Sequence, residues 1–287
     1  MGVSHSWTHW ISALARWRYD PGARLSVDVS GDGAEDLVFL HGLGGTHRYW
    51  TNGRDPLTFV NCRTVLVDLL GFGDSPRPWC RYSVDRHVRA LRLSLPQSGA
   101  MTLVAHSMGA VLALEYASRY PQSVRRLILI SLPCFRDISA AATWFRRRPG
   151  GWIYTNLGAT VLACMITRRL AGRWLPRLLP SIPRAVAEDL VKHNVCSSTS
   201  SLWEVIYRYQ LGPVVAALPA ELPVHCIHGR ADDTAPLEAV VTLSRIHERW
   251  TLAILDDADH HPWLRNEPAC RALIADILAD QRPLVLG

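Results

Sequence analysis

Three residues that could together activate a hydroxyl group lie at the ends of expected strands in this sequence. Ser107 directly follows one apolar run, Asp232 follows a second by three residues, and His260 comes after a third. A serine hydroxyl is a poor nucleophile at neutral pH and needs an adjacent base to take its proton. An imidazole suits that task, and a carboxylate holds the imidazole in the required tautomer. The order Ser, Asp, His therefore predicts a nucleophilic serine with His260 as base and Asp232 as the partner of that base.

Each of these positions also has a purely structural interpretation. A serine at a junction of strand and helix commonly caps the helix, and Asp232, beside Asp233, could be a turn residue. His261 directly follows His260, so the base could lie one residue further along the chain. His106, next to the serine, is expected to pack or to line a cleft rather than to take part in catalysis.

The residues around Ser107 suit a sharp turn between a buried strand and a helix. Ala105 and Gly109 are small, as such a turn requires, and the turn would lift the serine hydroxyl out of the sheet. The amide of Met108 would then lie at a helix N-terminus, where the helix dipole favours developing negative charge.

Apolar runs and helical patterns alternate along the chain and predict the scaffold that positions these residues. Apolar runs without polar alternation are typical of parallel strands covered on both faces. A β-hairpin is expected around residues 24–29, after the turn signal at 20–22. The pattern predicts a doubly wound α/β fold, in which chemistry occurs beyond the carboxyl ends of the strands. The expected strands are 37–42, 64–69, 101–106, 126–131, 224–229 and 251–256, and the expected helices are 84–95, 108–120, 237–247 and 268–281.

The alternation stops between residues 136 and 212, where helical patterns are interrupted by proline and arginine. The part from Arg136 to Gln210 holds eleven basic and four acidic residues, a net charge of +7 that leaves −1 for the remainder of the chain. Such a shift in charge indicates a separate unit. We therefore expect a core formed by residues 1–135 and 213–287, with residues 136–212 inserted as a helical cap.

Composition limits the remaining classes of protein. Hydrophobic residues make up 48% and charged residues 20% of the 287 residues, as in globular proteins with a sizeable core. No apolar window is long enough for a spanning helix, and residues 1–17 lack the pattern of a secretory signal. Seven cysteines occur singly, which favours reduced, packed thiols and a cytoplasmic location. His225 and His228 are taken to share one strand face with no carboxylate at metal-ligand spacing, so neither a metal nor a cofactor is expected.

Five motifs in this order resemble the α/β-hydrolase superfamily, of the capped esterase and lipase type, over about residues 20 to 281. The resemblance implies a mostly parallel central sheet with helices on both faces and a helical cap inserted after the sixth strand. Two departures from the family pattern are Ala105, in place of a glycine, and Asp259, where a glycine commonly precedes the histidine. The motifs are HGLGG (41–45), DLLGFGDSP (68–76), AHSMG (105–109), HGRADDTAP (228–236) and DADHHPWLRNEP (256–267).

The resemblance also implies roles for individual residues. Ser107 would be the nucleophile, Asp232 the acid and His260 the base of a catalytic triad. The backbone N–H groups of Leu43 and Met108 would form the oxyanion hole, and His41 is expected to brace the loop that carries Leu43. Candidate positions for the substrate pocket are Gly42, His106, Trp152, His261 and Trp263.

The implied function is a serine hydrolase that cleaves a carboxylic ester or thioester of a small, largely apolar substrate through an acyl-enzyme. Two rival functions stay open: an enzyme of secondary metabolism without net hydrolysis (a cyclase, elimination lyase or acyltransferase), and a catalytically silent binding protein. Epoxide hydrolases and dehalogenases are disfavoured because they need an aspartate where Ser107 stands.

The apolar stretch 152–166, flanked by arginines, leaves three interpretations of the cap. It could bury one face on the core and line the pocket with the other. It could instead form weak contacts with an anionic membrane or grip an acyl chain. Its arginines could also meet a phosphate of a substrate bound to CoA or to a carrier protein. Nucleic acid is not expected as a partner, because no recognition fold accompanies the arginines.

Overall fold

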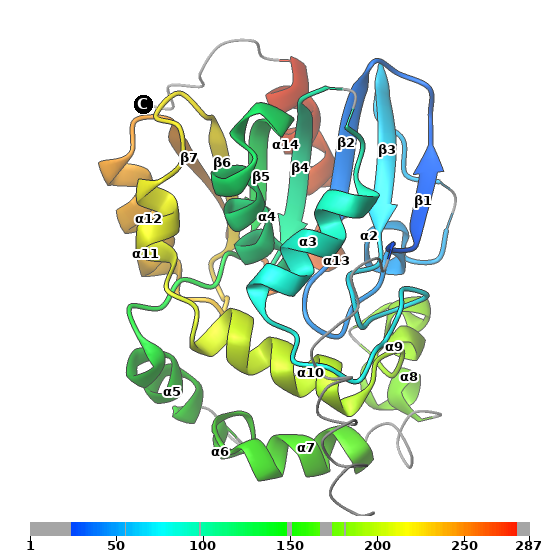
Figure 1. Cartoon of the computed structure of the whole chain (residues 1–287), viewed down its shortest axis with the longest axis vertical. Coiled ribbons are helices and arrows are strands. Elements are labelled where there is room, and N and C mark those ends of the chain that lie inside the picture. The colour runs from blue at the N-terminus through cyan, green and yellow to red at the C-terminus, as the bar shows by residue number, and fades with distance from the viewer. Residues whose placement is uncertain are drawn as a thin grey trace, which may run out of the picture.

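The computed structural model of the protein describes residues 24–54, 56–97, 99–147, 151–166, 174–180 and 182–279. Within these ranges, seven strands form one sheet in the order β1-β3-β2-β4-β5-β6-β7 (Figure 1). β1 pairs antiparallel with β3, and the other neighbouring strands pair in parallel. The strands are β1 (Val27–Ser30), β2 (Glu35–Leu40), β3 (Cys62–Val67), β4 (Met101–His106), β5 (Val124–Ile130), β6 (Val224–Gly229) and β7 (Trp250–Leu255).

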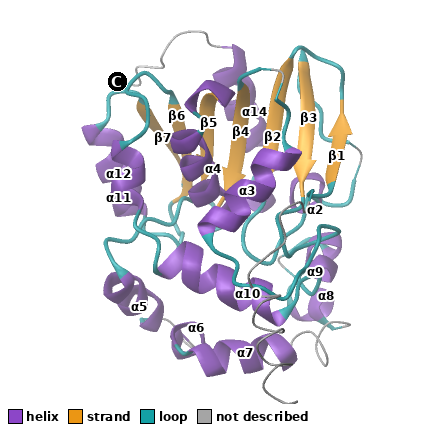
Figure 2. Cartoon of the chain, viewed as in Figure 1, coloured by secondary structure: helices purple, strands orange, loops and turns teal. Residues whose placement is uncertain are grey.

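Helices cover both faces of this sheet and its carboxyl edge (Figure 2). Among the described helices, none combines the length and the apolar character needed to cross a bilayer. The helices are α2 (Arg48–Thr51), α3 (Val84–Ser94), α4 (Met108–Arg119), η1 (Pro121–Ser123), α5 (Ile138–Arg146), α6 (Gly151–Thr155), α7 (Leu157–Ile166), α8 (Leu175–Leu178), α9 (Arg184–Asp189), α10 (Val195–Ser201), the π-helical η3 (Leu202–Tyr207), α11 (Leu211–Ala216), α12 (Leu237–Ile246), α13 (Pro262–Arg265) and α14 (Glu267–Ala279).

The predicted strands and helices of the core are confirmed to within two residues at each described end, and β4 begins and ends at the predicted residues. The predicted hairpin lies only partly within the described residues. Its second arm corresponds to β1, which pairs with β3, and its turn at 20–22 lies outside them. The helices between β5 and β6 therefore follow the fifth described strand and not a sixth. Residues 1–23, where the first arm of the expected hairpin falls, lie outside the described residues.

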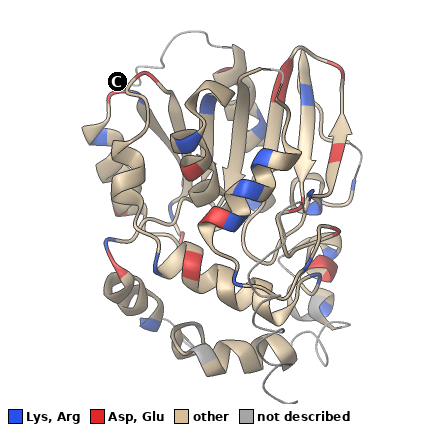
Figure 3. Ribbon diagram, in the orientation of Figure 1, with Lys and Arg blue, Asp and Glu red and all other residues tan. Residues whose placement is uncertain are grey.

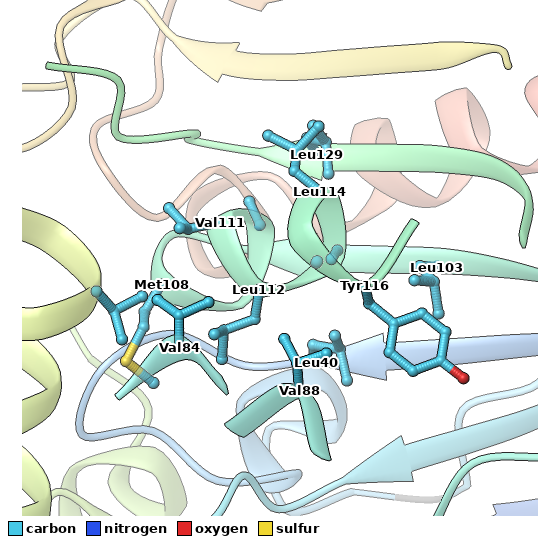
Figure 4. Close-up of a cluster of buried hydrophobic side chains, with 14 of the residues drawn as sticks. Leu40, Val84, Val88, Leu103, Met108, Val111, Leu112, Leu114, Tyr116 and Leu129 are labelled. Atoms are coloured by element: carbon cyan, nitrogen blue, oxygen red, sulfur yellow. The ribbon is translucent and has the colours of Figure 1, made fainter. Parts of the chain in front are cut away.

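Alternate residues of the central strands enter two separate apolar clusters, one on each face of the sheet. Leu127 and Leu129 face the cluster that α3 and α4 complete, whereas Ile128 and Ile130 face the cluster that α14 completes. Figure 4 shows the first of these clusters, with α4 side chains such as Leu112 packed between strand residues and α3. Because both faces are covered, the strands read as continuous apolar runs, and the polar residues that follow them gather at the carboxyl edge.

The helices between β5 and β6 extend beyond that carboxyl edge. In Figure 1, α5, α6 and α7 form the layer farthest from the sheet, and α10 lies between that layer and the strand ends. α11 returns the chain to the core and packs on α4.

Candidate active site

Ser107 occupies a tight turn between β4 and α4. Its backbone has a φ of 52° and a ψ of −117°, a left-handed conformation that non-glycine residues rarely adopt. Gly109 allows the turn to close, since a Cβ atom there would lie 2.6 Å from the carbonyl oxygen of Leu40 and 2.7 Å from that of His41. The Ser107 side chain makes no capping hydrogen bond to α4, so the interpretation of this serine as a helix cap is wrong.

The hydroxyl of Ser107 instead meets the imidazole of His260. The Oγ atom lies 2.9 Å from Nε2 of His260, and Nδ1 of the same ring lies 2.9 and 3.0 Å from the two carboxylate oxygens of Asp232. All three residues are buried. If Nδ1 donates its proton to the carboxylate, the lone pair on Nε2 faces the serine hydroxyl.

His261 lies beside this arrangement but has different surroundings. Its amide donates to Asp259, whose carboxylate also accepts from Arg265 at 2.6 and 2.8 Å. Burial lowers the pKa of the His261 imidazole to about 4, and the neighbouring His260 ring acts in the same direction. The geometry therefore brings His260, and not His261, to the hydroxyl of Ser107.

Asp232 is held by more groups than the sequence indicated. Its Oδ1 atom accepts from the amides of Thr234 and Ala235 at 2.8 Å, and its Oδ2 atom lies 3.2 Å from Nε2 of the fully buried His228. Burial would raise the pKa of this carboxyl, but hydrogen bonds from His228 and His260 outweigh burial and lower the pKa well below its usual value. The carboxylate is therefore charged at neutral pH.

The prediction that His225 and His228 share one strand face is wrong. Residues three apart on a strand point to opposite faces. Nδ1 of His225 contacts the Thr251 hydroxyl at 2.9 Å, whereas His228 reaches Asp232, four residues further along the chain. The spacing of four residues between His228 and Asp232 is the sequence signal that could have identified His228 as a partner of Asp232. Among the described residues, no group of three or more His, Cys, Asp or Glu side chains could hold a metal ion.

Two histidines, His41 and His47, hold the loop that carries Leu43 through hydrogen bonds. Nε2 of His41 accepts from the amide of Leu69 at 2.9 Å, and its Nδ1 lies 2.7 Å from the carbonyl oxygen of Gly42, which confirms the predicted bracing. Burial lowers the pKa of His41, as expected for a neutral ring in these contacts. His47 binds Asp68 through its amide at 2.6 Å and through Nδ1 at 3.0 Å.

Asp68 opens the motif beside this loop and is itself nearly inaccessible to solvent. Burial would raise the pKa of its carboxyl, but hydrogen bonds from His47 and from the amide of Asp74 outweigh burial and lower the pKa to about 2. A second carboxylate, Asp189 of α9, binds the loop from the side of the helices between β5 and β6. Its oxygens lie 2.7 Å from the Thr46 hydroxyl and 2.9 Å from the Arg48 guanidinium.

The candidate pocket residues separate into two groups. Gly42 lies directly beside Ser107, since a Cβ atom at position 42 would approach the serine Cβ to 3.1 Å. His106 and His261 lie next to it, with ring centroids 5.2 Å apart. The Nε2 atom of His106 contacts the His260 carbonyl at 2.8 Å, and burial lowers its pKa well below the usual value. His106 is thus a packed, neutral neighbour of the serine.

The two tryptophans do not join this group. Trp263 is fully buried in the apolar cluster beneath the sheet, where its indole nitrogen donates to the Trp50 carbonyl at 3.0 Å. Its assignment to the substrate pocket is therefore wrong, because the helical turn of α13 directs it into the core. Trp152 lies on α6 and is 63% exposed, in the layer farthest from the sheet (Figure 1).

Comparison with known proteins agrees with this fold. A family model described as the alpha/beta hydrolase fold matches residues 37–156. An uncharacterized protein of Mycobacterium tuberculosis (strain ATCC 25618 / H37Rv) is 34% identical over 263 residues, which cover 86% of this chain and 76% of the relative. The sheet order and the sharp turn at Ser107 are those of an α/β hydrolase. The chain belongs to the α/β hydrolase family.

Two further similarities are to proteins whose names state an activity. A protein of Arabidopsis thaliana named "Probable lysophospholipase BODYGUARD 1" is 25% identical over 88% of this chain and 60% of its own length. The chain spans between 28% and 60% of the length of the first four relatives of this name. The structure of an esterase from Exiguobacterium antarcticum superposes with a TM-score of 0.73 at 16% identity, covering 90% of this chain and 97% of the esterase.

Proposed function

We propose that the protein is a serine hydrolase that cleaves a carboxylic ester, or a thioester, of a small and largely apolar substrate. The observation that carries this proposal is the pair of contacts made by His260, 2.9 Å from the Ser107 hydroxyl on one side and 2.9 Å from Asp232 on the other. An imidazole between a hydroxyl and a charged carboxylate can take the proton that makes serine nucleophilic.

In the first half of the reaction, Ser107 attacks the carbonyl carbon of the ester while His260 takes the hydroxyl proton. The negative charge that develops on the carbonyl oxygen needs donors that are already in place. Met108 is the first residue of α4, where a backbone N–H has no acceptor within its own helix. We assign the N–H groups of Met108 and Leu43 as these donors.

The second half releases the acyl group. His260 returns its proton to the leaving alcohol or thiol, and the acyl group stays on the Ser107 oxygen. The same imidazole then takes a proton from a water molecule as the water oxygen attacks the acyl carbon. The bond from that carbon to the Ser107 oxygen breaks, His260 returns the proton to this oxygen, and the acid leaves. Asp232 stays ionised throughout, and His228 assists because its Nε2 atom, 3.2 Å from Oδ2, also stabilises the charged carboxylate.

We further propose that the helices between β5 and β6 act as a cap that selects the substrate. They lie beyond the carboxyl edge of the sheet (Figure 1), and η3 packs on α4, the helix that begins directly after Ser107. A thioester of CoA or of a carrier protein is the alternative substrate, because its phosphate could pair with arginines. A panel of p-nitrophenyl esters of increasing acyl length, together with acyl-CoA, distinguishes these substrates.

The test is a set of alanine substitutions in the full chain. We expect Ser107→Ala and His260→Ala to lower kcat for p-nitrophenyl esters by at least about 10³-fold. The matched control is His261→Ala, which should keep most of the activity. A fluorophosphonate probe should label the natural protein and not Ser107→Ala, while circular dichroism shows that both fold.

Each other outcome points to a different class of protein. Full ester hydrolysis by Ser107→Ala would rule out the proposal. Labelling of Ser107 without turnover of any ester or thioester in the panel would favour an enzyme without net hydrolysis. Failure of the probe to label the natural protein would favour a silent binding protein.

A further inference from the structure

The outward face of α7 is an apolar stripe. Its exposed residues are Gly158, Leu162, Met165 and Ile166, and this spacing places them on one side of a helix. The side chains of Leu162, Met165 and Ile166 are 58%, 41% and 46% exposed. The opposite side of α7 packs on α10, where the Cys164 sulfur lies 3.2 Å from the Ser198 hydroxyl.

The neighbouring helix α6 carries a further large apolar side chain that is exposed. Trp152 is 63% exposed, and α6 packs directly against α7. The ribbon of α7 carries no charged residue (Figure 3). Single exposed apolar side chains are ordinary on protein surfaces, but a contiguous apolar patch on an outer layer marks a surface that meets another apolar phase.

The sequence segment that contains α6 and α7 is rich in arginine. The fifty residues 138–187 contain eight arginines and no acidic residue. Of the described ones, Arg146 lies beside α6, with its Nε atom 3.4 Å from the Thr155 hydroxyl, and both Arg146 and Arg147 are exposed. The partner of this surface must therefore combine an apolar interior with negative charge at its boundary.

We propose that α6 and α7 dock the protein on an anionic phospholipid membrane. Trp152, Leu162, Met165 and Ile166 would enter the boundary between headgroups and acyl chains, and Arg146 and Arg147 would meet lipid phosphates. A helix of ten residues is about 15 Å long, so α7 lies on the membrane and does not cross it. A second copy of the chain fits less well, because a two-fold contact would bring the arginines of both copies together.

The experiment is flotation of the full-length protein with vesicles of phosphatidylcholine, with or without phosphatidylglycerol. We expect the protein to float with the anionic vesicles and to bind less as salt rises. The triple variant Leu162→Ser/Met165→Ser/Ile166→Ser should lose at least tenfold in binding. Arg146→Gln/Arg147→Gln should lose the preference for phosphatidylglycerol. Hydrolysis of a short, water-soluble ester should be unchanged in both variants.

The matched control is Ile246→Ser at the end of α12. Ile246 is likewise an exposed apolar residue, 65% exposed, but it lies on a helix that packs on the sheet and not between β5 and β6. Its flotation should equal that of the natural protein. Equal flotation of the triple serine variant and the natural protein would overturn the proposal, as would absence of flotation in the natural protein. A dimer in light scattering that the triple variant dissolves would assign the stripe to a second copy instead, and would also overturn it.

Discussion

The helices between β5 and β6 contact their surroundings in two different ways. The inner helices, α9, α10 and η3, bind the core through directional polar contacts, whereas the outer helices, α6 and α7, pack on other helices and present apolar side chains to solvent. Contacts from the inner part include Asp189 with Thr46 and Arg48, Asn194 with the Arg77 carbonyl, Ser200 with the Tyr82 amide, and Ser201 with His87.

This difference separates two tasks within one segment. Hydrogen bonds between buried groups fix distance and orientation, because each lost partner leaves an unsatisfied polar atom. Among the inner helices, α9 therefore holds the loop that carries Leu43 at a defined position, through Asp189. Apolar packing is not directional. The outer helices are held on one side by such packing, and their exposed apolar side remains available to a partner.

The largest test of this comparison is Asp189→Asn. The amide keeps the size of the carboxylate and one acceptor oxygen, but neither the charge nor the second acceptor. Thr46, Arg48 and Lys192 therefore cannot all keep their partner. We expect kcat for short esters to fall by about tenfold to 10²-fold with little change in KM, because small displacements of a positioned group cost that much. The measurement is a full rate curve, with Ser200→Ala as a control that breaks a contact away from the Leu43 loop. A kcat within twofold of the natural protein would mean that the loop does not need α9.

A second test uses pH and the contact between His87 and Ser201. Burial lowers the pKa of His87 to about 3 from its ordinary 6.5. Below about pH 6.5 the unfolded chain binds a proton that the folded chain does not, so the free energy of unfolding falls as pH drops towards 3. The slope is up to about 1.4 kcal/mol per pH unit for this one proton.

His87→Gln should remove that part of the slope and still reach the Ser201 hydroxyl. Urea unfolding at about pH 6.5 and at about pH 5 should then differ by about 2 kcal/mol less in the variant than in the natural protein. Equal slopes in the two proteins would show that the inner helices do not bury His87 in its neutral form.

The smallest expected effect concerns α5, which lies at the start of the segment. The indole nitrogen of Trp144 donates to the Asp233 carbonyl at 2.9 Å, next to Asp232. Trp144→Phe should lower stability by about 1 kcal/mol and change kcat by less than threefold, as judged by urea unfolding and ester assays. A tenfold loss of kcat would place α5 with the inner helices and would remove the contrast.

Much of the core and part of the site follow from sequence alone. The ends of β4, β6 and β7 lie within a residue of their predicted positions, because buried parallel strands are read as apolar runs that stop where polar chemistry begins. Ser107, Asp232 and His260 meet as their motifs predict, while their catalytic roles remain predictions.

Other features could not be read from sequence, for identifiable physical reasons. Asp189 and Thr46 lie 143 residues apart and belong to no shared motif, so only folding reveals their contact. Trp263 lies in a motif near the expected base, yet α13 turns its side chain into the core. The hint for Asp189 was its rarity, as one of four acidic residues among eleven basic ones between Arg136 and Gln210.

The order of the two parts along the chain also bears on how such a protein can diverge. The outer helices come first, and α9 to η3 follow as one stretch before the chain returns to β6. Insertions, deletions or exchanges between α5 and α9 would therefore change the exposed surface of the outer helices. The contacts that hold the Leu43 loop would stay intact. We expect descendants of this chain to vary most in the residues before α9 and least at Asp189.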